Sequence, residues 1–175
     1  FVSEALYLRD PEGNGIEIYR DRPRSEWVWD GNRVRMATTR LDTEDLLQQS
    51  TAAGWSEMPA KTVIGHIHLH VSNLEKATKF YSSTLGLHFT ASYPGAHFFA
   101  AGMYHHHVAT NTWYGDEILP AAPDRVGLNH FGIELADSDA LARTIANVVG
   151  QGAENQPKPK FVEDADGIRM RLYSR

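Results

Sequence analysis

Three histidines alternate with three apolar residues at positions 65–71, where the sequence reads Gly-His-Ile-His-Leu-His-Val. A period of two predicts a β-strand with one packed face and one face that carries the imidazoles. Imidazole fills a core poorly but binds metal ions well, so this face indicates a metal site. All nine histidines of the chain fall between His66 and His130, which is where further ligands are expected.

A run of three consecutive histidines, residues 105–107, lies in a predicted strand over residues 104–113. If Val108 and Thr110 pack against a helix, alternation places three side chains on the opposite face: His105, His107 and Asn111. The same rule places His106 on the packed side, unless a β-bulge turns it toward the site.

The composition is that of a globular protein that can bury a core, with 175 residues, 42% hydrophobic and 22% charged. The net charge of −5 argues against a nucleic-acid or anionic-membrane partner. The chain has no cysteine, which excludes thiolate ligands and leaves nitrogen and oxygen donors for a metal. No apolar run approaches 18 residues, so we expect a cytoplasmic protein.

The elements that position the histidines form an internal repeat. The first run comprises predicted elements at residues 65–71 (strand), 73–85 (helix), 87–92, 96–101 and 104–113 (strands). The second comprises residues 128–135 (strand), 137–149 (helix), 159–163 and 168–173 (strands). Aligning His66 with His130 also aligns Asn73 with Asp137, so each helix begins with a capping residue.

The first twenty residues predict a β-hairpin around the turn sequence Asp-Pro-Glu-Gly-Asn. Residues 8–19 resemble residues 162–173 at the end of the second run, and this alignment places Glu17 at the position of Arg171. We therefore expect residues 1–20 to be the C-terminal hairpin of an incomplete preceding module, and the chain to be part of a longer protein.

This arrangement resembles the vicinal-oxygen-chelate superfamily, which includes glyoxalase I, bleomycin-resistance proteins and extradiol dioxygenases. It is most similar to fused two-domain members described as catechol 2,3-dioxygenases. The motifs that carry the resemblance lie at residues 10–17, 65–74, 80–81, 85–86, 104–107 and 128–131. The resemblance implies an α+β fold in which paired βαβββ modules form a curved-sheet cleft. The expected organisation is the hairpin, a linker with a short helix (residues 21–62), and a domain over residues 63–175 with modules 63–115 and 126–175.

Dioxygenases of this family hold Fe(II), or sometimes Mn(II), with a histidine from each of two first strands and a glutamate from the last strand. Such a site binds a vicinal diol and O₂. The resemblance implies that His66 and His130 are the histidine ligands and that His106 is the catalytic acid–base. The glutamate position is Arg171, however, and a cation cannot bind a metal ion.

Three residues are candidates for the missing ligand. His107 would give a three-histidine site, His68 lies beside His66 on one strand face, and Glu17 would contribute from the hairpin. If it is not a ligand, His68 is expected to line the substrate site with Asn111, where Arg171 would bind an anionic group.

The first functional hypothesis is an extradiol dioxygenase that acts on a small aromatic diol. The alternatives are a metal-free structural or small-molecule-binding domain without cofactor, favoured by Arg171, and a glyoxalase-like isomerase or lyase that uses His107. Exposed strand edges predict a homo-oligomer.

Overall fold

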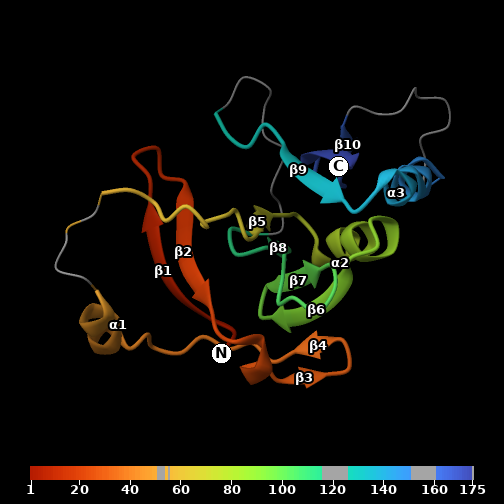
Figure 1. The fold of residues 1–175 in the computed structure, drawn as a ribbon. Coiled ribbons are helices and arrows are strands. Elements are labelled where there is room, and N and C mark those ends of the chain that lie inside the picture. The colour runs from red at the N-terminus through yellow and green to blue at the C-terminus, as the bar shows by residue number, and fades with distance from the viewer. Residues whose placement is uncertain (51–53, 55, 116–125, 151–160, 175) are drawn as a thin grey trace. The chain divides into compact units, whose positions relative to one another are not determined.

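The computed structural model describes residues 1–175 except residues 51–53, 55, 116–125, 151–160 and 175. The chain divides into two compact units, Phe1–Gly65 and His66–Arg175, which are described separately below (Figure 1). None of the described helices is long and apolar enough to cross a membrane.

The first unit is built from short elements. They are β1 (Ser3–Arg9), β2 (Gly15–Asp21), the 3₁₀ turn η1 (Arg24–Glu26), β3 (Trp29–Asp30), β4 (Arg33–Val34) and α1 (Thr43–Gln49). Strands β1 and β2 form the predicted antiparallel hairpin. Asp42 caps α1 by accepting a hydrogen bond from the Asp45 amide (3.0 Å). The β3–β4 pair was not predicted, because a two-residue strand is too short to show a period.

The second unit begins with a module whose sheet has the order β5-β8-β7-β6 (Figure 1). Its elements are β5 (Ile67–His70), α2 (Leu74–Thr78), the π-helical turn η2 (Lys79–Thr84), β6 (His88–Tyr93), β7 (Ala96–Ala100) and β8 (Val108–Asn111). The first and last strands pair in parallel, and the other pairs are antiparallel. The helix begins where the Asn73 side chain accepts from the Lys76 amide and ends before Gly86, whose φ is +81°.

The next module repeats this connectivity with one strand fewer among the described residues. Its elements are β9 (Phe131–Leu135), α3 (Ser138–Gly150), β10 (Val162–Glu163) and β11 (Arg169–Ser174). Again the first and last strands, β9 and β11, pair in parallel, and β10 pairs antiparallel to β11. Asp137 caps α3 by accepting from the Ala140 amide (2.7 Å). The α+β class is therefore confirmed, while residues 159 and 160 of the predicted strand at 159–163 lie outside the described residues.

The turns of the β1–β2 and β10–β11 hairpins have the same geometry. In each, one aspartate oxygen (Asp10 or Asp164) accepts backbone N–H groups two and four residues further on, at 2.8–2.9 Å. The glycines that follow, Gly13 and Gly167, have φ values of +87° and +76°. This likeness supports the alignment of the two hairpins, although the origin of residues 1–20 in a preceding module stays a prediction.

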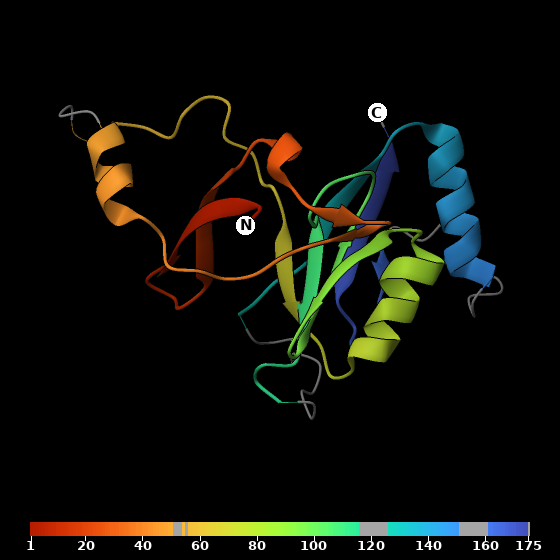
Figure 2. The same ribbon diagram turned by 90° about the horizontal axis from the view of Figure 1, so that it is seen from below.

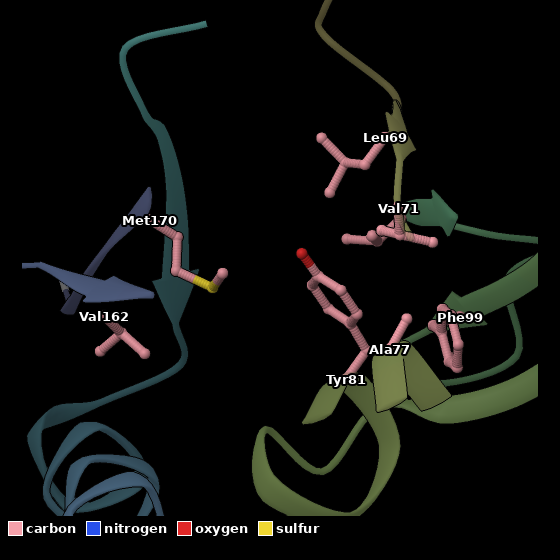
Figure 3. Packing of buried hydrophobic residues seen from close by; sticks show 8 residues of the cluster. Leu69, Val71, Ala77, Tyr81, Phe99, Val162 and Met170 are labelled. Atoms are coloured by element: carbon pink, nitrogen blue, oxygen red, sulfur yellow. The ribbon is translucent and has the colours of Figure 1, made fainter. Parts of the chain in front are cut away.

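The two modules of the second unit share one hydrophobic core (Figure 3). Its buried members are Leu69, Val71, Ala77, Tyr81, Phe99, Val108, Val162 and Met170. The blue helix α3 lies beside the green helical turn η2, on the same side of the strands (Figure 2). Within this core the Tyr81 hydroxyl donates to the Asp164 carboxylate (2.8 Å), which ties η2 to the β10–β11 turn.

We expect Tyr81→Phe to reduce the free energy of unfolding by about 1–3 kcal/mol at pH 7, because the buried Asp164 carboxylate loses a donor. Burial raises the pKa of Asp164 above its usual range. Its contribution to stability is therefore fully present below the pKa of the unfolded state and is lost as pH rises through the folded pKa. The Tyr81 hydrogen bond counteracts this loss, since it favours the ionised carboxylate.

The destabilisation should consequently be smaller near pH 4 than at pH 7. Urea unfolding at both pH values measures it, with Tyr93→Phe as the control because Tyr93 is 49% exposed on β6. Equal losses at the two pH values, or no loss at either, would contradict the assigned role of the pair.

Candidate metal centre

Three imidazoles from two separate motifs converge in the first module of the second unit. The potential ligand atoms of His66, His68 and His106, here called the three-histidine group, all lie within 4.8 Å of one another. The Nε2 atoms of His68 and His106 are 3.2 Å apart. The ring centroid of His66 lies 4.2 Å from that of His106 and 5.2 Å from that of His68.

Strand pairing explains why these motifs meet. Because β5 and β8 are parallel neighbours, the Ile67 amide donates to the carbonyl oxygen of His107 (3.0 Å). This hydrogen bond places the residue before His107 beside His66 and His68, at the start of β5. His68 and His106 are 38 residues apart in the sequence, and the pairing of β5 with β8 brings them together in space.

The direction of His106 differs from strict alternation. The predicted strand over residues 104–113 is wrong in its first part, since β8 begins only at Val108. The irregular backbone before it turns His106 toward β5, as the sequence analysis allowed for a bulge. His107 is instead exposed, where its Nδ1 atom accepts from the Ala101 amide (3.2 Å) and its ring stacks on Tyr104.

The donor set fits a divalent transition metal. Burial, reinforced by the neighbouring histidines, holds the pKa of His106 far below its usual range, so the ring is neutral and can bind through a lone pair. Two ligand atoms at about 2.1 Å from one tetrahedral ion lie ~3.4 Å apart, close to the observed separation of 3.2 Å between the Nε2 atoms of His68 and His106. Imidazole nitrogen suits iron, zinc, copper and nickel.

The other predicted ligands lie elsewhere. No further residue belongs to the three-histidine group within the part of the chain that the structure describes. His130 is exposed before β9, with Nδ1 2.7 Å from Asn129 Oδ1 and its ring against Phe161. Glu17 belongs to the first unit and accepts from the Tyr7 hydroxyl (3.0 Å). The roles of His130 and Glu17 as ligands stay predictions, since neither residue belongs to the three-histidine group.

Arg171 occupies an exposed position on β11, where it pairs with Gly132 of β9. The register of the β10–β11 hairpin matches that of β1–β2, with Glu163 opposite Arg169 as Arg9 is opposite Gly15. Arg171 therefore stands where the first hairpin carries Glu17. A carboxylate ligand is accordingly absent from this position of the second module.

Polar and aromatic residues continue the site along β5 and β8. Asn111 is buried, and its Oδ1 atom lies 2.7 Å from Nδ1 of His70. Just beyond, the ring of Trp113 stacks near His68, with centroids 6.4 Å apart and planes at 27°, and the ring of Tyr114 lies 4.4 Å from His70. The sequence analysis predicted Asn111 for the substrate site but gave these two aromatic residues no role there; their position just after the last strand was the available signal.

Comparisons with known proteins agree with this architecture. The family model described as "Glyoxalase/Bleomycin resistance protein/Dioxygenase superfamily" matches residues 63–171. A catechol-2,3-dioxygenase of Bacillus subtilis (strain 168) is 46% identical over 144 residues, which are 80% of this chain and 50% of that protein. The chain thus spans about half the length of this relative.

Two solved structures are similar to part of this chain, and the first of them supports the shared fold. A glyoxylase/bleomycin resistance protein/dioxygenase domain from Frankia sp. EAN1pec has a TM-score of 0.51 and 16% sequence identity, covering 65% of this chain and 97% of that chain. A glyoxalase/dioxygenase from Nostoc punctiforme has a TM-score of 0.49 and 14% identity, covering 70% and 98%.

We expect the chain to bind one Zn(II), and His106→Ala to weaken this binding by more than the ~10–100-fold typical of losing an outer-shell partner. His68→Ala should have a similar effect, because each change removes one of three ligands. Competition with a coloured chelator measures the affinity, and His88→Gln serves as the control because His88 is an exposed residue of β6. If His130→Ala abolished binding while His68→Ala did not, the assigned ligand set would be wrong.

Proposed function

Since the chain belongs to the glyoxalase/bleomycin resistance protein/dioxygenase superfamily, we propose that it acts as a metal-dependent extradiol dioxygenase of the catechol 2,3 type. Such an enzyme breaks the ring bond beside a vicinal diol and adds both atoms of O₂ to the product. The three-histidine group is the observation that carries the proposal, because it gathers three potential metal ligands in one place. The relative from Bacillus subtilis supports the choice of reaction.

His66, His68 and His106 would hold the metal, with Fe(II) as the first choice and Mn(II) as the second. A bound divalent iron would bring the diol and O₂ together and transfer electrons between them, which side chains cannot do alone. Because imidazole ligands bring no negative charge, they do not neutralise a cation, and the site therefore favours an anionic diol. In this arrangement His106 serves as a ligand rather than as the acid–base that the family resemblance implies.

His70 is suited to accept the proton that the diol gives up. Its Nδ1 atom faces the Asn111 Oδ1 atom at 2.7 Å, and the Trp113 amide donates to the same oxygen (3.4 Å). An amide oxygen only accepts, so the His70 proton sits on Nδ1 and its Nε2 atom carries the lone pair. His70 is exposed on the strand face of β5 that also carries His66 and His68, so this lone pair is available to a substrate bound there.

The indole of Trp113 offers a fixed, flat surface for an aromatic ring. It is 56% exposed, yet its Nε1–H donates to the Pro94 carbonyl oxygen (3.1 Å). A Cβ atom at Gly95 would lie 3.0 Å from the indole, so the glycine makes room for this position of the ring. An exposed indole held beside His68 supports an aromatic substrate.

A second candidate is a metal-binding domain without dioxygenase turnover. Arg171 supports it, because a dioxygenase of the family would place its glutamate ligand there. A glyoxalase-like lyase or isomerase is included in this alternative, since it needs a metal but no O₂. Oxygen uptake separates both from the first proposal.

We expect protein loaded with Fe(II) under anaerobic conditions and desalted to consume O₂ when catechol is added, and to form a ring-cleaved product in equal amount. His66→Ala should abolish this activity because it removes a ligand. An oxygen electrode and mass spectrometry of the product measure the two quantities, and Zn(II)-loaded protein is the redox-inactive control. Full iron occupancy without O₂ uptake would contradict the dioxygenase and favour the second candidate.

We expect Trp113→Ala to raise the KM for catechol by about two- to tenfold, since an aromatic pair contributes about 0.5–1.5 kcal/mol. The kcat should change little, and the Fe(II) affinity should stay that of wild type because Trp113 holds no ligand atom. Steady-state kinetics and chelator competition test this, with Trp113→Phe as the matched variant that keeps an aromatic ring. An unchanged KM in Trp113→Ala would show that the substrate binds elsewhere.

A further inference from the structure

His105 lies outside the three-histidine group but contacts it directly. It is 1% exposed, and its Nδ1 atom lies 2.7 Å from the Nδ1 atom of His106. Two imidazole nitrogens form a hydrogen bond at this distance only if one carries the proton and the other offers its lone pair. The pair therefore has two possible arrangements.

Only one arrangement allows His106 to bind a metal. If His105 donates, His106 accepts at Nδ1 and carries its own proton on Nε2, the atom that faces His68 at 3.2 Å. An Nε2–H group cannot be a ligand. If His106 donates from Nδ1, its Nε2 lone pair points into the three-histidine group instead.

We propose that His105 is a positioning residue for the metal centre, which accepts the Nδ1–H of His106 and so fixes the tautomer and orientation of that ligand. This inference rests on the metal site of the proposed function and adds to it a residue that holds no metal itself. Metal-binding histidines commonly donate their second ring N–H to such a partner, and the loss of the partner typically weakens metal binding 10–100-fold.

The position of His105 is itself fixed. The Thr90 hydroxyl donates to its carbonyl oxygen (2.5 Å), and Thr90 is fully buried on β6. The Tyr104 ring covers the imidazole at a centroid distance of 4.2 Å. Neighbours in a regular strand point to opposite faces, so His105 and His106 can meet only because the strand starts later, at Val108. The break in alternation thus places His106, the proposed ligand, next to His105, the acceptor of its Nδ1–H.

Two substitutions separate the acceptor role from packing. His105→Phe keeps an aromatic ring but removes the acceptor, whereas His105→Asn loses bulk and keeps an acceptor oxygen near the position of Nδ1. We expect Co(II) affinity, measured by chelator competition on the full chain, to fall about 10–100-fold in His105→Phe and only a few-fold in His105→Asn. The Co(II) visible absorption spectrum should change in His105→Phe and stay close to wild type in His105→Asn.

The test depends on which of the two variants binds Co(II) more weakly. A role in packing alone predicts the opposite order, with His105→Phe the better binder, and that result would overturn the inference. Unchanged affinity in His105→Phe, with binding lost in His106→Ala, would also overturn it while leaving the metal site intact. If wild type bound no Co(II), the metal site of the proposed function would fail as well. His88→Gln is the surface control.

A measurement on wild type covers the case in which a variant does not fold. Long-range ¹H–¹⁵N correlation spectra of the Zn(II)-loaded protein report which nitrogen of each histidine carries a proton. We expect His106 to be protonated at Nδ1 and bound through Nε2, with an unprotonated Nδ1 on His105. A proton on the Nδ1 atom of His105 would overturn the inference.

Discussion

The parallel pairing of β5 with β8 is the constraint on which the site depends. The Ile67 amide bonds to the His107 carbonyl oxygen, and the Val71 amide bonds to that of Asn111 (2.9 Å) at the other end of the register. This pairing sets His106 beside His66 and His68, and Asn111 beside His70. A shift of this register would therefore separate the proposed metal ligands and break the His70–Asn111 hydrogen bond as well.

The two modules share connectivity but differ in what they contribute. The first carries the three-histidine group, whereas the second has Arg171 where the hairpin of the first unit has Glu17. Through Val162 and Met170 the second module completes the common core, and Asp164 accepts from Tyr81. Within the described residues, its clearest contribution is to support the module that contains the three-histidine group.

Much of the fold follows from local sequence signals. The elements and their order could be predicted because they depend on residues that are close in the sequence. The signals were the period of two in β5, the helix caps at Asn73 and Asp137, and the internal repeat. The pairing of His66 with His68 was predictable for the same reason. The turn of His106 was not, since it comes from a break in alternation that the strand pairing imposes. Repeat symmetry favoured His130 as a ligand. Such symmetry identifies equivalent strand positions, but it carries no information on the distances between side chains, and His130 does not belong to the three-histidine group.

The central claim is that a divalent metal binds within a single module, on His66, His68 and His106. Anomalous diffraction at the zinc edge from crystals of the Zn(II)-loaded protein tests it most directly. The account predicts one strong peak within about 2.1 Å of a ring nitrogen of each of these residues. A peak held by His66 and His130, or no peak at the three-histidine group in zinc-loaded crystals, would contradict it.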